Sequence, residues 1–486
     1  MPRQVPDAAG PPPMTGRPPL DPERRRLAAA ATGRQAWYAW GPYLADRQWG
    51  TVREDYSADG DAWRSFPYDQ ALARAYRWGE DGLLGLSDEL GDLCFAPAIW
   101  NEADATVKRR LFGLANPEGN HGEDVKELYF YLDGTPTGSY LKALYRYPQA
   151  AFPYDELRQV NGARSRLEPE YELLDTGIFD DGRFFDLLVE YAKASPTDLV
   201  IRLTVTNRGP APAAVHLLPS LWYRNTWSWG LDERRPRITR VTQPGAAILK
   251  AEHHRLGRYW LVAPSADATL LTENDSDAQA LWGAGGEAGR TREMLDAAVL
   301  AGDPSLADAT RPGSRAALQY RWQLAAGAAR TIHLRLARGA APPRLPDAAA
   351  VVDRRAEEAD RFHAALGSSA TPAEARAVMR QAFAGLAWSR QTYHYGVARW
   401  LEGDPAGPTP PAARLSGRNH EWRHFEAAEV LAMPDTWEYP WFASWDSAFH
   451  AVAWALIDPH FAKEQLLLLT REWYMHPNGQ LPAYEW

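Results

Sequence analysis

The sequence predicts a multidomain β + α protein in which a large β-sandwich precedes a helical region. Apolar and polar residues alternate along many short stretches between about residues 140 and 339, a pattern typical of half-buried strands. After the Pro- and Ala-rich segment 340–346 the apolar period changes to about 3.6, which is typical of helices. The chain has 486 residues, which is long for one domain, so two domains are expected.

The composition indicates a globular protein and argues against nucleic acid and membranes as partners. Hydrophobic residues make up 45% of the chain and charged residues 24%. The net charge of −9 argues against nucleic acid as a partner. Cys94 is the only cysteine, so no intramolecular disulfide can form and a reducing compartment is favoured. Because the first twenty residues lack a signal-peptide core and no later run is apolar for about 18 residues, we expect a cytoplasmic protein without a membrane partner.

Aromatic residues are unusually frequent, with 21 Trp and 21 Tyr. They cluster with charged and amide residues rather than spreading through aliphatic runs. Stacking planes combined with polar groups are typical of sites that recognise sugars. Large β-sandwiches also use many aromatic residues in their strands, so composition alone leaves both interpretations open.

Residues 1–30 are predicted to be a disordered tail because residues 1–20 are rich in Pro and Gly, with a short helix predicted over 24–31. The sandwich is predicted over 31–339 and begins with a dense aromatic patch at 37–63. Polar and aromatic residues alternate there without the period of a helix or a strand. One interpretation is a buried ion-pair network between domains. The other is a surface that contacts a bound sugar through Trp40, Gln48, Trp49, Arg53 and Glu54.

Asn, His, Glu and Asp side chains gather in the segment 116–127. These side chains can bind metals, but the segment has no repeated ligand spacing and no cysteine. We therefore expect a turn between strands, with no metal-binding role for His121. No metal and no cofactor are predicted anywhere in the chain.

Period-two alternation locates several strands within 31–339. A strand over 199–205 is followed by a turn over 207–210, and residues 215–218 are predicted to continue the hairpin. Segments 318–324 and 330–336 repeat this arrangement. Many short strands with regular turns predict a sandwich.

Three tryptophans, an arginine and an asparagine lie together in the segment 222–230. One interpretation is a loop that faces a ligand. The alternative is packing against the neighbouring domain, and the residues alone do not separate the two.

Residues 340–370 are predicted to be a linker and a helix, and residues 371–486 to be helical. Thr371 and Glu374 fit a capping box around Pro372, which marks a helix start. Asp458 and Pro459 mark another start. The predicted helices are 347–366, 371–395, 442–456 and 458–474.

The segment 437–486 places one carboxylate, Asp446, among aromatic residues. Aromatic side chains exclude water, which favours the neutral form of a carboxylic acid, as a general acid requires. Aromatic faces also suit the apolar faces of sugar rings. The alternative is that Asp446 caps or salt-bridges the helix that begins there. The neighbouring aromatic residues are Trp437, Tyr439, Trp441, Phe442, Trp445 and Phe449.

Trp445, Asp446, Phe449 and His450 match a W-D-x-x-F-H segment, and the chain resembles glycoside hydrolase family 63 over most of its length beyond about residue 35. The resemblance implies an N-terminal β-sandwich followed by an (α/α)6 toroid, of which 371–486 would be an incomplete part. It implies inverting cleavage of an α-glucosidic or α-mannosidic bond in an oligosaccharide or small glycoside. Asp446 would be the general acid, and Tyr439, Trp441 and Trp445 would shape the sugar subsite.

The resemblance places the general base downstream of Trp486, so the chain is interpreted as truncated. A partial toroid would leave apolar helix faces in water at about 25 cal/mol per Å2. We therefore expect residues 1–486 alone to be poorly soluble or inactive. The alternatives are a non-catalytic carbohydrate-binding or assembly protein and an inverting sugar phosphorylase. The sequence identifies neither the sugar nor the oligomeric state.

Overall fold

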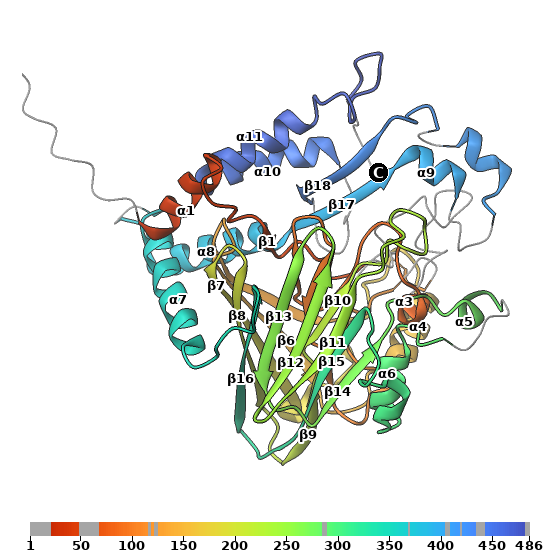
Figure 1. Ribbon diagram of the computed structural model, residues 1–486, viewed down its shortest axis with the longest axis vertical. Helices are drawn as coiled ribbons and strands as arrows, with labels where there is room; N and C mark the ends of the chain where they lie inside the picture. Colours follow the sequence, from red (N-terminus) through yellow and green to blue (C-terminus); the bar gives the residue numbers. More distant parts are fainter. Residues whose placement is uncertain are drawn as a thin grey trace, which may run out of the picture.

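The computed structural model describes residues 21–47, 68–114, 118–120, 125–283, 289–367, 370–403, 409–417, 420–433 and 443–481. Two large antiparallel sheets form the body of the molecule, and the C-terminal elements lie across one end of them (Figure 1). The predicted β + α architecture is therefore confirmed.

The first sheet has the strand order β1-β2-β3-β10-β15-β9-β4, with β14 also paired to β15. Several neighbouring strands in this order are not consecutive in the chain, so segments far apart in sequence pair within this sheet. Its strands are β1 (Trp40–Gly41), β2 (Leu86–Asp88), β3 (Leu93–Ala96), β4 (Ile99–Trp100), β9 (Ala213–Leu217), β10 (Ser220–Tyr223), β14 (Ala268–Thr272) and β15 (Arg315–Leu324).

The second sheet has the order β11-β12-β13-β16-β8-β7-β6-β5, so β11 and β5 are its edges. Each neighbouring pair is antiparallel. Its strands are β5 (Leu128–Gly134), β6 (Tyr140–Pro148), β7 (Phe184–Ser195), β8 (Asp198–Asn207), β11 (Arg237–Gln243), β12 (Ala246–His253), β13 (Gly257–Pro264) and β16 (Ala329–Arg338).

One hydrophobic core lies between the two sheets. Phe95 and Leu221 of the first sheet and Leu203 and Leu261 of the second are fully buried in it. Two sheets that share a core through alternate residues form a sandwich. The sandwich predicted from the period-two pattern is present.

The chain crosses between the sheets at two places where the sequence pattern predicted hairpins. β8 and β16 belong to the second sheet, whereas β9 and β15 belong to the first. The buried side-chain amide of Asn207 stabilises both crossings. Its Nδ2 donates to the carbonyl oxygen of Ala211, between β8 and β9, at 2.8 Å and to that of Leu324, at the end of β15, at 3.0 Å. Both hairpin predictions were wrong. Alternation indicates which face of a strand is buried, but not which sheet the strand joins.

The first described residues form a helix, α1 (Pro22–Ala31), rather than part of a disordered tail. Glu23 in its first turn is fully buried, and it accepts hydrogen bonds from Thr137 Oγ1 and Ser139 Oγ, each at 2.6 Å. The tail predicted for residues 1–30 is therefore wrong from residue 22 onward, because a buried acidic side chain anchors α1 to the sandwich, and the short helix predicted over 24–31 is confirmed. Residues 1–20 lie outside the described residues.

Short helices lie at the side of the sandwich opposite α7 (Figure 1). Among them, α6 buries Leu295 and Val299 against Leu270 of β14. These helices are α3 (Tyr68–Ala73), α4 (Tyr154–Ala163), α5 (Ala278–Trp282) and α6 (Met294–Leu300). The 3-10 turns that precede β17 (Arg390–Gly396) are Leu173–Thr176, Asp180–Gly182 and Pro304–Ala307.

The C-terminal region contains helices and one β-hairpin. The helix predicted over 371–395 ends at Trp388, because the following RQTYHYG segment is rich in residues that favour strands. The N-cap of that helix is Pro372 and not Thr371. The last predicted helix ends at Leu468 rather than near residue 474. The elements are α7 (Ala348–Ala364), α8 (Ala373–Trp388), β17 (Arg390–Gly396), α9 (Val397–Glu402), the 3-10 turn Ala412–Ser416, β18 (Glu426–Ala432), α10 (Ser444–Ile457) and α11 (Pro459–Leu468).

The C-terminal helices pack mainly on the sandwich. Val352 of α7 lies in a cluster with Val200 of β8. Trp388 of α8 stacks on Tyr131 of β5 with ring centroids 5.2 Å apart. The described helices α10 and α11 contact each other, but the described residues contain no closed ring of helix pairs. The toroid therefore remains a prediction. None of the described helices is long and apolar enough to span a membrane.

Candidate functional site

Asp446 lies in the first turn of α10 and is half-buried. Ala443 precedes the helix, and its carbonyl accepts a hydrogen bond from Ser447 Oγ at 3.0 Å. A carboxylate in the first turn interacts favourably with the positive end of the helix dipole, so Asp446 also has a structural role. Its place at the start of a helix, predicted from sequence, is confirmed.

Two aromatic residues beside Asp446 are exposed. Trp445 is 56% exposed and Phe449 is 67% exposed. Their rings make a T-shaped pair with centroids 5.9 Å apart and an interplanar angle of 72°. The pair presents aromatic surface within three residues of Asp446, and an exposed aromatic face can stack on the apolar face of a sugar ring. In the described residues these rings do not form the enclosing wall predicted from sequence.

The opposite face of α10 holds this helix in place. Ala451, Trp454 and Ile457 are buried in a cluster that includes Phe383 of α8. Trp454 contacts Phe461 of α11 with ring centroids 4.8 Å apart. The packing fixes which side of α10 faces outward, and therefore fixes the exposure of Trp445.

A pocket with a volume of about 370 Å3 lies where the sandwich meets β18 and α11. Gln465 of α11 fixes its wall, because the side chain donates to the carbonyl of Val430 at 3.1 Å and accepts from the amide of Ala432 at 3.0 Å. Its volume falls within the range of small-molecule sites. The residues that line it are Tyr38, Tyr43, Glu89, Leu90, Ala428, Glu429, Val430, Phe461, Glu464, Gln465 and Leu468.

The hydrogen bonds around this pocket order its aromatic and acidic groups. Tyr38 Oη donates to Asp458 Oδ2 at 2.5 Å, and Tyr43 Oη donates to the carbonyl of Tyr38 at 3.0 Å. Glu429 accepts from Tyr474 Oη at 2.9 Å and from Trp473 Nε1 at 3.2 Å. The tyrosines and Glu429 are therefore held in place before any ligand binds.

Burial raises the pKa of several of these groups. Burial, followed by the charge of Asp458, raises the pKa of Tyr38. Burial raises the pKa of Tyr43 to about 12 and that of Glu89 above its ordinary value. Both phenols are thus neutral near pH 7. The described lining contains three glutamates and neither lysine nor arginine. Such a lining can accept hydrogen bonds from the hydroxyls of a polyol or take a cationic group.

Asp446 is absent from the described lining of this pocket. The two regions are connected through Phe461, which lines the pocket and also contacts Trp454 on the buried face of α10. The structure therefore describes two neighbouring features: an acidic aromatic pocket, and a carboxylate beside an exposed aromatic pair.

Trp40 is fully buried in the sandwich core. Its Nε1 donates to Tyr259 Oη at 3.1 Å, and its ring contacts the Tyr259 ring. It has no exposed face on which a sugar ring could stack, so we correct the predicted ligand contact at Trp40 to a core position. The core requires large apolar side chains from both sheets, and Trp40 supplies one from β1.

The other predicted sugar contacts, apart from Trp445, lie outside the described residues, and their roles stay predictions. His121 is also outside these residues. The predicted contacts concerned are Gln48, Trp49, Arg53, Glu54, Tyr439 and Trp441.

The segment 222–230 serves packing more than ligand contact. Trp222 is buried and its Nε1 donates to Glu80 Oε2 at 3.0 Å. Trp227 donates to Asp275 Oδ1 at 2.7 Å, and Trp229 is buried. These partners all lie within the sandwich, so the patch packs inside that domain, and packing against the neighbouring domain stays a prediction.

The acidic pocket was not predicted from the sequence. Tyr38 and Tyr43 stand in the aromatic patch that the sequence singled out, so a signal for them existed. Glu89, Glu429 and Glu464 come from three separate elements and belong to no motif. The described residues contain no group of His, Cys, Asp and Glu side chains able to hold a metal ion.

No protein-family model matches the chain. The chain is 40% identical to the uncharacterized protein YMR196W of Saccharomyces cerevisiae, over 96% of its own length and 47% of the yeast protein. It therefore spans about half the length of this curated relative.

Solved structures resemble the chain only distantly. A polysaccharide lyase matches with a TM-score of 0.22 and 12% identity over 51% of this chain and 25% of its own. A human-microbiome protein with kojibiose phosphorylase in its name matches with a TM-score of 0.20 and 10% identity over 45% of this chain and 24% of its own. Likenesses of this size carry no argument about the fold or the activity of the chain.

Proposed function

We propose that the protein is an inverting glycoside hydrolase that cleaves an α-glucosidic or α-mannosidic bond, with Asp446 as the general acid. The observation that carries the proposal is the half-buried carboxylate of Asp446 beside the exposed pair of Trp445 and Phe449. The similarity of this W-D-x-x-F-H segment to glycoside hydrolase family 63 supports the same assignment. The proposal concerns the activity of the whole protein.

In the proposed reaction Asp446 donates its proton to the glycosidic oxygen as the bond to the anomeric carbon breaks. A second carboxylate removes a proton from a water molecule on the opposite face of the sugar, and this water attacks the anomeric carbon. The two carboxyl groups of inverting enzymes lie about 6.5–9.5 Å apart to leave room for the water. The resemblance places that base outside residues 1–486.

The exposed ring of Trp445 is proposed to stack on the sugar whose bond is cleaved. Tyr439, Trp441, Gln48, Trp49, Arg53 and Glu54 remain proposed contacts of the same subsite. The acidic pocket would hold a neighbouring sugar unit, because Glu464 and Glu89 can accept from hydroxyls while Phe461 supplies an apolar face.

The test is to incubate the purified protein with α-linked glucosides and mannosides and to follow the released sugar by proton NMR. The proposal predicts release of the β-anomer first, in the absence of phosphate. First release of the α-anomer would contradict inversion. Release of a sugar phosphate that requires added phosphate would identify the phosphorylase alternative, and binding without turnover would identify the carbohydrate-binding alternative.

Residues 1–486 alone are expected to bind sugar weakly and to show little or no hydrolysis. Full activity from these residues would contradict the assignment of the base to another part of the protein. In that case the glutamates of the acidic pocket would become the first candidates for the base.

A further inference from the structure

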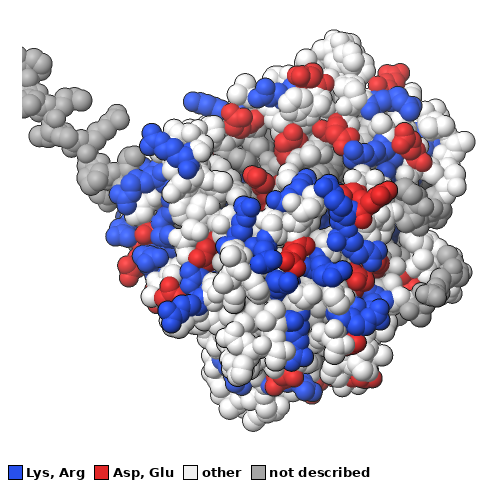
Figure 2. All heavy atoms as spheres, viewed as in Figure 1, with Lys and Arg blue, Asp and Glu red and all other residues white. Residues whose placement is uncertain are grey.

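A basic groove lies on the second sheet where β11, the loop before it and the β12–β13 turn come together. Its volume is about 610 Å3. Figure 2 shows basic side chains gathered across the middle of this face, with acidic side chains between them. The residues that line the groove are Arg234, Arg235, Pro236, Arg237, Glu252, His253, His254, Gly257 and Arg258.

Positive charge exceeds negative charge in this lining, which holds four arginines and one glutamate. Glu252 is shared by Lys250 at 2.9 Å and Arg258 at 3.0 Å. Arg237 is opposite Glu252 in the strand register, yet it makes no ion pair with any described residue. The groove therefore keeps a net positive charge in a chain whose net charge is −9.

The carboxylates near the groove pair with its other cations but do not neutralise them all. Arg234 contacts Asp232 at 2.9 Å, and His254 Nε2 lies 3.0 Å from the same carboxylate. Arg235 lies 3.3 Å from Asp275 and 3.8 Å from Glu273, and its guanidinium lies over the Trp227 ring. These contacts orient the guanidinium groups and leave most of their N–H donors available.

His253 adds a neutral donor. Its Nδ1 accepts the backbone N–H of Arg255 at 3.2 Å and that of Leu256 at 3.3 Å, so the ring proton of the neutral form is on Nε2. Burial lowers the pKa of His253 to about 4, which keeps the ring neutral near pH 7. Its ring stacks on Tyr223 with centroids 5.5 Å apart, which fixes its orientation.

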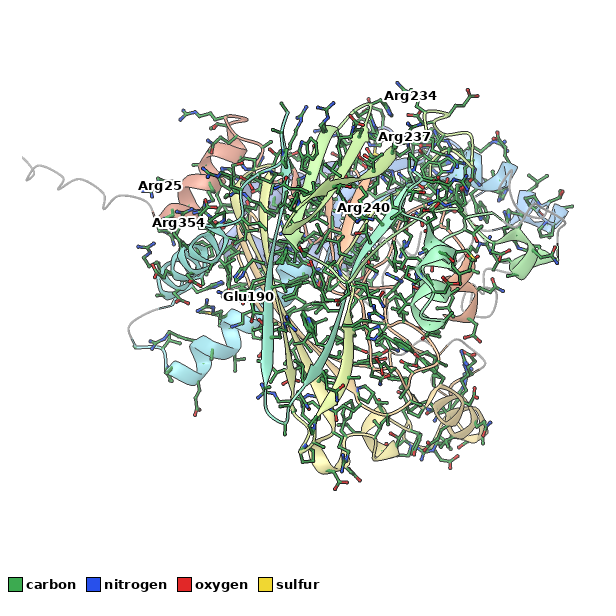
Figure 3. The ribbon with its side chains drawn as sticks, turned by 60° about the horizontal axis from the view of Figure 1, so that its bottom comes forward. Arg25, Glu190, Arg234, Arg237, Arg240 and Arg354 are labelled. Atoms are coloured by element: carbon green, nitrogen blue, oxygen red, sulfur yellow. The ribbon has the colours of Figure 1, made fainter. Side chains whose placement is uncertain are left out.

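We propose that this groove binds the phosphoryl group of a phosphate ester or a free phosphate ion, with Arg237 as the main contact. A planar guanidinium can donate two parallel hydrogen bonds to a phosphate, and this favours Arg at such sites. Figure 3 shows Arg234, Arg237 and Arg240 following one another along β11 and the loop before it. Because acidic side chains interrupt the basic ones, an extended polyanion such as nucleic acid would meet both signs of charge. The site is independent of the proposed glycosidase activity.

The test is isothermal titration calorimetry of the purified protein with inorganic phosphate and with glycerol phosphate, and with glycerol as the neutral control. The titrations are run near physiological ionic strength, where long-range attraction between exposed charges is screened. The unmodified protein is expected to bind at least one of the two phosphates saturably and not to bind glycerol. Binding of inorganic phosphate alone would identify the free ion as the ligand, whereas binding of glycerol phosphate would identify an ester.

Two substitutions on the same strand separate a defined site from general charge attraction. Arg237→Ala is expected to weaken phosphate binding about tenfold or more, because it removes a charge-assisted contact. Arg237→Lys keeps the charge but not the planar fork, and an intermediate loss is expected. Arg240→Ala removes the same charge outside the groove lining and should leave binding within about twofold of the unmodified protein.

Three results would overturn the proposal. They are no saturable binding of either phosphate to the unmodified protein, unchanged binding in Arg237→Ala, and equal weakening by Arg237→Ala and Arg240→Ala. Both side chains are exposed on β11, so neither substitution is expected to prevent folding. Circular dichroism and thermal unfolding of each variant check this.

Discussion

Tyr38 donates its hydroxyl hydrogen to Asp458 Oδ2 at 2.5 Å, and this bond joins the segment before β1 to the start of α11. The other carboxylate oxygen, Oδ1, accepts the backbone N–H of Phe461 at 3.1 Å as the cap of that helix. Asp458 is almost fully buried. One carboxylate therefore fixes both the first turn of α11 and a wall of the acidic pocket.

Tyr38→Phe is expected to lower the free energy of unfolding by about 1–3 kcal/mol, because it leaves a buried carboxylate oxygen without its donor. Urea unfolding measures the change. Tyr171→Phe is the matched control, since Tyr171 Oη donates to Glu156 in solvent at 2.6 Å and its removal should change stability little. Equal losses in the two variants would contradict a special role for Tyr38.

Asp88 provides a prediction of pH dependence. Burial, followed by the charge of Asp92, raises the pKa of Asp88 from the ordinary 3.8 to about 7. The folded protein therefore holds this proton more tightly than the unfolded chain does. As pH rises from the ordinary pKa to the raised one, the unfolded chain loses the proton first, so the contribution of Asp88 to stability falls. Above the raised pKa both states have lost the proton, and the contribution stays constant.

The variant Asp88→Asn cannot titrate and isolates this contribution. The free energy of unfolding of the unmodified protein, minus that of the variant, is expected to fall across the same pH window. Urea unfolding at steps through the window gives this difference. A difference that rises with pH would show that the carboxylate is stabilised in its charged form instead, for example by the amides of Leu90 and Leu93 that donate to it.

The sequence predicted the sandwich because its signal is local. Alternation along the segment 199–205 corresponds to β8, and its apolar members do face the core. The crossings at Asn207 were not predictable from alternation, because they involve side-chain bonds to the carbonyl of Ala211 and to that of Leu324, the latter 117 residues away. Local periodicity does not carry that information.

The candidate site was predictable to the extent that it lies within one helix. Asp446, Trp445 and Phe449 share α10, and a helix places residues four apart on one face. The acidic pocket was not predictable, because Glu89, Glu429 and Glu464 meet only through tertiary packing. The aromatic signal also failed for Trp40, since a tryptophan that serves a core and one that binds a sugar look the same in sequence.

Trp40 and Trp445 are expected to respond in opposite ways to substitution. Trp40→Phe should lower the free energy of unfolding by about 1–3 kcal/mol through lost core contacts and leave sugar affinity unchanged. Trp445→Ala should change stability little, because the ring is 56% exposed, and should weaken sugar binding by about 0.5–1.5 kcal/mol. Thermal unfolding and calorimetric titration with an α-glucoside measure both properties. If the folded Trp40→Phe variant lost sugar affinity, the assignment of Trp40 to the core alone would be wrong.

Phe449, Val452 and Leu456 form an exposed apolar stripe along α10. Apolar surface of this kind favours association between copies in water. Residues 1–486 are expected to self-associate as concentration rises, and Leu456→Glu should reduce this association in sedimentation velocity experiments. Leu167→Glu is the control, since Leu167 is also an exposed leucine, at 97%, but is not part of α10. A similar reduction in the control would show that added charge, and not the stripe, is responsible.

The role of Asp446 as the general acid is tested by the turnover of an α-glucoside by the full protein with Asp446→Asn, measured together with sugar binding. The amide cannot donate the catalytic proton but keeps the size of the side chain. We expect a loss of turnover of about 100-fold to 10,000-fold with sugar affinity retained. Turnover equal to that of the unmodified protein would contradict the assignment of Asp446 as the general acid.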